Sequence, residues 1–429
     1  MATAPDYELL IRDVWIHDGR DTPPVHGDGA VRDGRVVAIG ATTGDAVQEI
    51  DGEGRALAPG FIDVHTHDDL EVVRQPDMPA KLSQGVTTVV VGNCGISASP
   101  VIPGRTVPDP MNLLGGDDEF RYPRFADYRA AVERAQPAVN VAALVGHTAL
   151  RQNHLDRLDR AATDDEIAAM RAQLRDALDA GALGLSTGLA SASAFHAPDD
   201  EVRALSEELD GRRHTYASHL RDEFAGIVPA LEEAIGVGRH SGAPVRVSHL
   251  KCAGADNWGR STEVLAALDH GSRDHGGPCD CYPYAAGSST LDLKQITDAY
   301  DILITWSDPH PDQGGRLLAA IAADWNVSLL DAARRLQPAG AVYHGMDEAD
   351  VRRILAHPRT MVGSDGLPRD PRPHPRLWGS FPRVLGHYAR DVGLFPLHTA
   401  VHKMTGLPAA RFGLRGRGVP CDGAQADLV

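Results

Sequence analysis

One short segment, Pro59-Gly-Phe-Ile-Asp-Val-His-Thr-His67, carries the strongest information in this sequence of 429 residues. Its apolar run predicts a buried strand that ends in two histidines separated by one residue. Alternate side chains of a strand point to the same face, so His65 and His67 can both reach one metal ion. Because the chain contains 20 histidines, chance explains a lone His-x-His pair equally well. The metal interpretation therefore depends on what the other predicted strands carry.

From about residue 57 onward, short apolar runs alternate with longer helical patterns. Eight such runs end in polar or small residues, near His67, Cys94, His147, Thr187, His219, His249, Tyr284 and Asp365. One intervening helix is marked by Thr163-Asp-Asp-Glu166, which has the spacing of a capping box, and by Gly181 at the expected C-terminus. Eight buried strands separated by helices predict an α/β protein built on a distorted (β/α)8 barrel.

Five of these run ends carry side chains of the types that bind metals. These side chains, six in all because the first run end carries two, are His65, His67, Cys94, His219, His249 and Asp365. The C-terminal ends of all strands in such a barrel meet at one face, so these side chains are expected to converge. Thiolate, imidazole and carboxylate are the ligands that zinc prefers. A single histidine at a strand end is usually a hydrogen-bonded core residue, but six converging groups predict a metal site.

The rest of the chain divides around this barrel, which we expect over residues 58–410. Residues 1–57 contain strand-forming runs and predict the N-terminal part of a small β-sandwich domain, whose C-terminal part starts within 411–429. Residues from about 285 to 346 break the strand–helix rhythm and predict an insertion on the barrel rim, a lid or specificity element. Helical patterns in and beside it lie near Leu317–Trp325, Ser328–Leu336 and Asp347–His357.

Composition excludes several classes of partner. The formal net charge of −17 repels phosphate backbones, so nucleic acid is not expected. No run approaches the ~20 apolar residues of a membrane helix, and Met1-Ala-Thr-Ala-Pro5 does not resemble a signal peptide. Five cysteines, an odd and sparse set, do not form a disulfide framework and indicate a reducing compartment. We expect a cytoplasmic protein with a small-molecule substrate; the oligomeric state stays open.

The opening segment resembles the first-strand signature of the amidohydrolase superfamily, and the chain as a whole resembles the D-aminoacylases (N-acyl-D-amino-acid deacylases). The motifs that carry this resemblance lie at 85–95, 216–223, 247–252, 280–284, 363–368 and 374–379. The lysine distribution agrees, because no lysine occurs between Lys81 and Lys251 and the fourth strand therefore lacks the carboxylated lysine of hydantoinases. Cys94 is the natural substitute, since a zinc-bound thiol is deprotonated.

The resemblance implies a role for each candidate residue. Cys94, His219 and His249 would hold a tight zinc ion, and His65, His67 and Asp365 a weaker or optional second one. Asp365 would serve as general base and then general acid in metal-assisted hydrolysis of the amide bond. Lys251, Tyr282 and Arg376 would bind the α-carboxylate of an N-acyl-D-amino acid.

Three alternatives stay open at this stage. The enzyme could act on a cyclic amide or lactam as hydantoinases do, it could prefer N-acyl-D-glutamate or aspartate, or it could be a non-catalytic relative. His147 either lines the pocket or is simply hydrogen-bonded, and Glu223 either lies at the surface or supports a ligand histidine. Cys279 and Cys281 are expected to be packing residues. We also expect the C-terminal part of the small β-domain to be incomplete, leaving an exposed edge and reduced stability.

Overall fold

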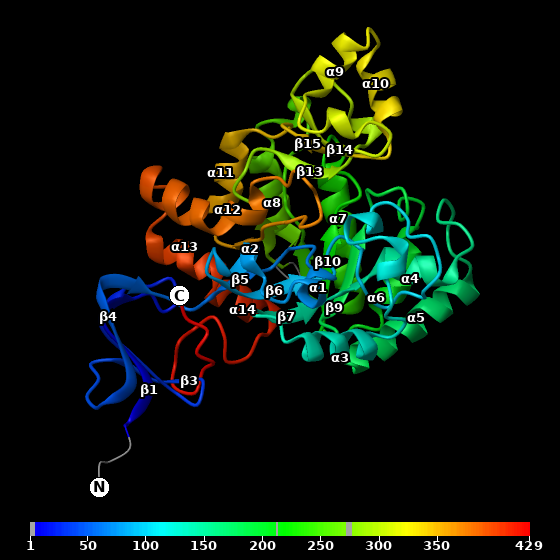
Figure 1. The fold of residues 1–429 in the computed structure, drawn as a ribbon. Coiled ribbons are helices and arrows are strands. Elements are labelled where there is room, and N and C mark those ends of the chain that lie inside the picture. The colour runs from blue at the N-terminus through cyan, green and yellow to red at the C-terminus, as the bar shows by residue number, and fades with distance from the viewer. Residues whose placement is uncertain (1–4, 212, 272–276) are drawn as a thin grey trace.

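A computed structural model describes residues 5–211, 213–271 and 277–429, so the leader prediction for residues 1–4 lies outside the described residues. Two parallel sheets form the centre of the molecule (Figure 1). The first contains β5 (Phe61–Asp63), β6 (Val86–Val91) and β7 (Asn140–Ala143). The second contains, in spatial order, β16 (Thr360–Val362), β12 (Cys279–Cys281), β11 (Val245–Val247), β10 (Thr215–His219), β9 (Gly184–Gly188) and β8 (Val145–Gly146).

The two sheets meet at both of their edges. β7 and β8 are consecutive pieces of one run, and the parallel bridge between Thr66 and Gly366 links the segments that follow β5 and β16. Counting β7 and β8 as one, eight parallel strands follow one another in chain order around the centre. Each of the eight predicted runs supplies one of these strands, as the (β/α)8 barrel requires.

Helices surround this barrel and share its apolar core with the strands and loops. They are α1 (Glu71–Arg74), α2 (Pro79–Leu82), η1 (Met111–Leu113), η2 (Asp117–Glu119), α3 (Phe125–Ala135), α4 (His147–His154), α5 (Asp164–Asp179), α6 (Asp199–Ser206), α7 (Ile227–Ser241), η3 (Ala255–Asn257), α8 (Ser261–Gly271), α11 (Glu348–Ala356), α12 (Arg376–Arg383), the π-helix η6 (Val384–Asp391), α13 (Leu397–Met404) and α14 (Gly406–Phe412). The predicted capping box is confirmed, because the Thr163 hydroxyl accepts from Glu166 N and the Glu166 carboxylate accepts from Thr163 N. Met170, Leu174 and Leu178 then face the core from one side of α5.

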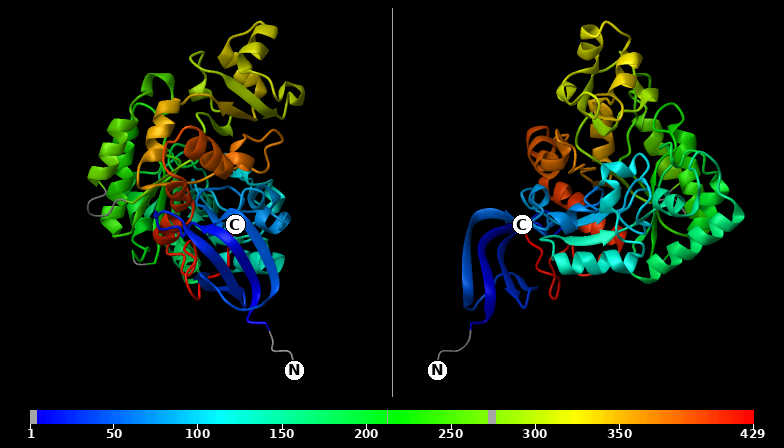
Figure 2. Two further views of the ribbon diagram at one scale, coloured as in Figure 1. Left: turned by 90° about the vertical axis from the view of Figure 1, so that its left-hand side faces the viewer. Right: turned by 45° about the vertical axis from the view of Figure 1, so that its right-hand side comes forward.

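Residues 287–343 form a separate layer above the barrel, drawn in green and yellow in Figures 1 and 2. Its antiparallel sheet has the order β13 (Gly287–Thr290), β15 (Ala339–Tyr343), β14 (Ile302–Ser307), and it carries η4 (Leu293–Gln295), η5 (Pro311–Gln313), α9 (Leu318–Asp324) and α10 (Leu329–Leu336). Ile304, Ile321 and Leu336 belong to an apolar core distinct from that of the barrel. The three helical patterns predicted for this part of the chain correspond to α9, α10 and α11, whereas its strands were not anticipated.

The N-terminal strands form a four-stranded sheet beside the barrel (Figure 2). Its order is β3 (Arg35–Gly40), β2 (Val25–Arg32), β1 (Tyr7–Ile16), β4 (Ala46–Leu57), with β1 and β4 parallel. The C-terminal segment runs along it, since Val36 N donates to Ala424 O (2.9 Å) and Ala58 N donates to Val429 O (2.8 Å). No helix in the described ranges is long and apolar enough to cross a membrane.

Candidate metal centre

The candidate ligands lie just beyond the strands, where the backbone leaves the ladder. β5 ends at Asp63, so His65 and His67 occupy the following loop and not the strand that the sequence predicted. Cys94, His249 and Asp365 have positive φ angles of 54°, 34° and 49°. Non-glycine residues held in this region cost about 1–3 kcal/mol each and cluster at functional sites. The fold thus maintains strained backbone at three of the six predicted ligands.

Cys94 lies at the centre of the cluster. Its Sγ atom is 3.2 Å from Nε2 of His65 and 3.3 Å from Nε2 of His249. Asp365 follows β16, which lies beside β5 in the barrel, and its Oδ1 atom is 3.4 Å from Nε2 of His65 and 3.1 Å from Nε2 of His67. One ligand atom from each of His65, Cys94, His249 and Asp365 lies within 4.8 Å of the others. These side chains come from four different strand ends and converge as predicted.

His219 joins the same cluster from β10. Its ring is perpendicular to that of His249, with centroids 4.4 Å apart, and it hydrogen-bonds the Cys94 thiol. His219, Glu223 and His249 form a second group whose ligand atoms also lie within 4.8 Å of one another. All six predicted metal-site residues therefore lie together, and His249 belongs to both groups.

The charges of the cluster are strongly coupled. Burial disfavours charge on Cys94 and His65, yet each stabilises the charged form of the other, so the pKa of the thiol is lowered well below and that of the imidazole raised well above its ordinary range. Burial likewise opposes ionisation of Asp365, but Arg376 and His65 outweigh it and hold the pKa of this carboxyl well below its usual range. Asp365 is thus an ionised carboxylate at neutral pH.

The three predicted carboxylate-binding residues lie beside this cluster. Arg376, at the start of α12, is buried, and its Nη1 atom is 2.8 Å from Oδ2 of Asp365. Its guanidinium lies over the Tyr282 ring at 4.8 Å, and its Nε atom has no hydrogen-bond partner among the described residues. Lys251 Nζ lies 6.0 Å from the centroid of the same ring. Arg376 is therefore buried against Asp365 and Tyr282.

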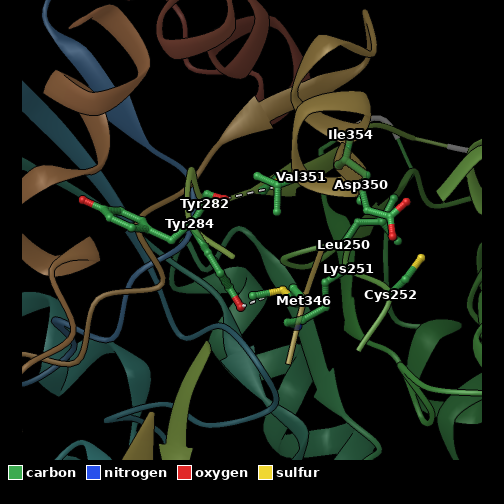
Figure 3. A pocket seen from close by; sticks show the side chains of 10 residues that line it. Leu250, Lys251, Cys252, Tyr282, Tyr284, Met346, Asp350, Val351 and Ile354 are labelled. Atoms are coloured by element: carbon green, nitrogen blue, oxygen red, sulfur yellow. Dashed lines mark hydrogen bonds between the residues drawn. The ribbon is translucent and has the colours of Figure 1, made fainter. Parts of the chain in front are cut away.

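A narrow apolar cavity adjoins Lys251 and Tyr282 (Figure 3). The Tyr282 hydroxyl points to the sulfur of Met346, 4.0 Å away, on the segment that returns from the rim insertion. Burial raises the pKa of Tyr282 well above its ordinary value, so the phenol keeps its proton and can donate a hydrogen bond. Cys252 and Cys281 also line the cavity, and burial raises the pKa of Cys252 to about 12, in keeping with packing residues.

Three polar residues contact the predicted ligands or the loops that carry them; sequence reasoning left Glu223 open and did not link Asp280 or Lys81 to the site. Asp280 Oδ1 accepts from His249 N at 2.9 Å and lies 3.1 Å from Nδ1 of His65. Glu223 Oε1 is 3.0 Å from Nδ1 of His249 and 2.5 Å from Lys251 Nζ. Glu223 therefore lies against His249, one of the predicted ligands, and not at the surface. The alternation of Asp280 with two buried cysteines was the available signal for an inward-facing carboxylate.

The third residue is Lys81, whose wholly buried ammonium lies under the loops that carry His65, His67 and Asp365. No pattern around Lys81 in the sequence indicated a link to the site, because its partners lie up to 283 positions away.

His147, whose role the sequence left open, is a hydrogen-bonded core residue. Its Nε2 atom lies 2.9 Å from Oε1 of Glu201.

The donor set fits a zinc ion. One thiolate, four imidazoles and one carboxylate converge from five strand ends, and these are the sulfur, nitrogen and oxygen donors that zinc takes in proteins. The second ring nitrogens of His65 and His249 face the carboxylates of Asp280 and Glu223, the support that metal-binding histidines usually have. The residues present can hold one metal ion around Cys94, His219 and His249, and a second beside Asp365.

Comparison with known proteins agrees with this geometry. A model of the amidohydrolase family matches residues 48–429. A D-aminoacylase of Alcaligenes xylosoxydans xylosoxydans is 49% identical over 424 residues, which cover 99% of this chain and 87% of the relative. Among solved structures, a D-aminoacylase with a binuclear metal centre, for which one-metal activation and second-metal attenuation are described, is 48% identical with a TM-score of 0.95, covering 99% of this chain and 89% of its own. An N-acyl-D-glutamate deacylase of Bordetella bronchiseptica, complexed with zinc and a phosphonate mimic of the tetrahedral intermediate, is 47% identical with a TM-score of 0.95 and the same two coverages.

Proposed function

Because this chain belongs to the amidohydrolase family, we propose that it is a zinc-dependent deacylase that hydrolyses N-acyl-D-amino acids to a carboxylate and a free D-amino acid. The observation that carries the proposal is the Cys94 thiol, which lies among histidines from three strand ends and opposite an ionised Asp365. Relatives with 47–49% identity over nearly the whole chain carry the same activity in their names.

We propose that Cys94, His219 and His249 hold the tight zinc ion, and that His65, His67 and Asp365 provide a second, weaker position. Zinc bound there would supply the Lewis-acid chemistry that amide hydrolysis needs at neutral pH. Asp365 takes a proton from the attacking water at a carboxylate oxygen and returns it to the leaving nitrogen, without which the amine would depart as an anion. The lowered pKa of Asp365 supports its starting role as a base.

The substrate's α-carboxylate is assigned to Arg376, Lys251 and Tyr282. Lys251 and Arg376 both lie against the Tyr282 ring, and Arg376 also contacts Asp365, so two cations and a protonated phenol lie beside the proposed base. The unpartnered Nε of Arg376 is a buried donor that a carboxylate oxygen can satisfy. Binding the carboxylate here places the adjacent amide towards the metal centre.

The main alternative is a cyclic amide substrate. The fourth barrel strand, β9 (Gly184–Gly188), carries Ser186 and Thr187 at its end and no lysine, so the residue that bridges two metals in hydantoinases has no counterpart there. Ser186 is hydrogen-bonded to the backbone of Gly92, and Thr187 to the hydroxyl of Tyr216. This strand end therefore favours the thiolate-centred site of a deacylase.

The side-chain preference separates two versions of the proposal. Lys294, in the rim layer, lies with its ammonium 4.8 Å from the centroid of the Phe195 ring. The cation would favour an acidic substrate side chain, whereas Phe195 and Met346 would favour an apolar one. We place the apolar preference first, with N-acyl-D-glutamate or aspartate as the alternative.

We also propose a cytoplasmic location and a small-molecule substrate without nucleic acid or membrane partners. All five cysteines are unpaired, and four of them are buried. A reducing compartment is consistent with this arrangement, because the thiol of Cys94 must remain free to ligate metal.

The test is amine release from N-acetyl-D-methionine, N-acetyl-L-methionine and N-acetyl-D-glutamate, with hydantoin as the cyclic substrate. We expect release from the D-enantiomers only, abolished by chelation and restored by zinc. Faster amine release from N-acetyl-D-methionine would establish the apolar preference, and faster amine release from N-acetyl-D-glutamate the acidic one. Ring opening of hydantoin without amine release would replace the proposal with the cyclic-amide alternative.

A further inference from the structure

Lys81, in the short helix α2, is the most completely buried cation near the candidate metal centre that the proposed mechanism does not use. Its side chain has no exposed surface. Its ammonium lies 2.8 Å from Asp63 Oδ2 and 3.1 Å from Asp68 Oδ2, and donates to the hydroxyls of Thr66 (2.9 Å) and Ser364 (3.0 Å). One cation therefore contacts both the loop after β5 and the loop after β16.

These two loops carry three predicted site residues, His65, His67 and Asp365. Regular sheet hydrogen bonding ends before them, since β5 stops at Asp63 and β16 at Val362. Beyond those points the loops are joined by Asp365 N donating to His65 O (2.7 Å) and by His67 N donating to Gly366 O (3.1 Å). Lys81 lies at this junction and contacts residues adjacent to each of the three side chains.

Asp63 extends the link beneath the cluster. Its Oδ1 atom accepts from Ser364 N at 2.8 Å and from His65 N at 3.3 Å, while its Oδ2 atom faces Lys81. The Lys81 side chain and this carboxylate thus hold both loops from below. Removing a buried cation from two carboxylates is strongly destabilising, so a purely structural role is the alternative that a test must separate.

We propose that Lys81 is a positioning residue, which holds the His65–His67 loop and the Asp365 loop in register so that the second metal position and the general base are correctly placed. This inference rests on the proposed function for its catalytic part, but its effect on metal binding is independent of turnover. The Cys94, His219 and His249 position lies on other strand ends, so a zinc ion there would be held without Lys81.

The test removes the two hydroxyl partners of Lys81, one from each loop, in Ser364→Ala and Thr66→Val. Both variants leave the buried charges paired. The control is Ser206→Ala, which deletes a buried hydroxyl that donates within α6 to Arg203 O. Zinc binding is measured by competition with a chromophoric chelator, thermal unfolding by calorimetry, and kcat and KM for N-acetyl-D-methionine at one equivalent of zinc.

We expect each hydroxyl variant to weaken the second equivalent of zinc about 10- to 100-fold, the usual effect of losing a partner that orients a ligand. The first equivalent should be retained, and kcat should fall by a similar factor while KM changes little. The double variant should lose less than the product of the two single losses, because either substitution already breaks the link through Lys81.

Equal losses of both zinc equivalents together with a lowered melting temperature would reduce Lys81 to a structural residue, and independent multiplicative losses would show that each hydroxyl acts locally. Unchanged zinc affinity and kcat in both variants would overturn the inference outright. If the wild-type protein releases no amine, the proposed function fails, while the zinc titrations still decide the role of Lys81. Lys81→Met, if it folds, should reproduce the loss of the second zinc equivalent.

Discussion

The Cys94 cluster and the Glu201 cluster both contain buried charged groups, but their polar atoms are arranged in opposite ways. Around Cys94, lone-pair donors from separate strand ends point at one another and converge within 4.8 Å. Around Glu201, each carboxylate oxygen faces a hydrogen donor: His147 and Arg151 contact Oε1, and Ala162 N donates to Oε2. The Glu201 carboxylate is thus satisfied by donors of its own chain, whereas the polar atoms around Cys94 include four that are placed to share one metal ion.

The backbone conformation also differs between the two clusters. Cys94 and Asp365 have positive φ angles, whereas His147, Arg151 and Glu201 lie within regular helices. Burial alone therefore does not identify a site, since the Glu201 cluster is buried at least as deeply as the Cys94 cluster. Convergent acceptors on strained backbone indicate a bound cation, and complementary donors on helices indicate a structural lock.

The strongest way to break this comparison is to remove the central thiol. Cys94→Ala should abolish binding of the first zinc equivalent and lower kcat/KM for N-acetyl-D-methionine by at least about 10³-fold, since a catalytic metal contributes several kcal/mol to the barrier. Zinc content by elemental analysis and amine release measure the two effects. Cys252→Ala is the matched control, because this buried thiol has no place in the cluster. A Cys94→Ala protein that keeps both zinc and activity would contradict the assignment.

The next largest effect is expected for the proposed general base. Asp365→Ala should lower kcat about 10²- to 10⁴-fold, the usual contribution of positioned proton transfer, while the first zinc equivalent remains bound. Steady-state kinetics with parallel zinc analysis would show the separation. The exposed Asp165→Ala in α5 is the control for loss of a carboxylate. Loss of both zinc equivalents together with activity would indicate that Asp365 mainly holds metal.

The convergence of the ligands could be predicted from sequence because it depends on local signals. A short apolar run ending in His, Cys or Asp marks the end of a barrel strand, and barrel geometry brings all such ends to one face. All six candidates, from His65 to Asp365, were identified in this way. Their exact placement was less accessible, since His65 and His67 lie beyond β5 and reach the cluster through the junction with Gly366 and not through the strand pleat.

Most contacts that support the predicted ligands could not be predicted, for a physical reason. Asp280 and Lys81 act through segments that are distant in sequence, and no periodicity encodes such pairs, while for Glu223 the sequence left support of a histidine as one of two interpretations. One strand of the rim layer was missed for a related cause. Gly287–Thr290 is short and contains neither β-branched aliphatic nor aromatic residues, so only pairing with β15 makes it a strand, whereas the missed β14 carries β-branched and aromatic residues of its own.

A milder test of the site concerns substrate binding. Tyr282→Phe should raise KM for N-acetyl-D-methionine about 10- to 100-fold with a smaller change in kcat, because one hydrogen bond to a charged group contributes about 1.5–3 kcal/mol. The corresponding amide, N-acetyl-D-methioninamide, lacks the carboxylate and should be hydrolysed equally by both proteins. Tyr300→Phe, a half-buried tyrosine of the rim layer, is the control. An equal loss on acid and amide would place Tyr282 outside the carboxylate site.

The smallest effect on turnover, and the sharpest contrast with the metal centre, is expected for Glu201→Gln. Burial opposes ionisation of Glu201, but His147 and Arg151 outweigh it and lower its pKa to about 2. A carboxyl with a depressed pKa contributes stability above its unfolded pKa, near 4.5, and that stability is lost as pH falls towards 2. In zinc-free samples, the wild-type advantage in free energy of unfolding over Glu201→Gln should therefore shrink by about 2 kcal/mol between pH 6 and pH 3.

The control is Glu207→Gln, at an exposed ion pair with His240. The difference in free energy of unfolding between this variant and the wild type should change little with pH, because surface pairs contribute little. A wild-type advantage that stays constant with pH would mean that Glu201 is not held ionised, and an effect of Glu201→Gln on zinc affinity would mean that the two clusters are not separate.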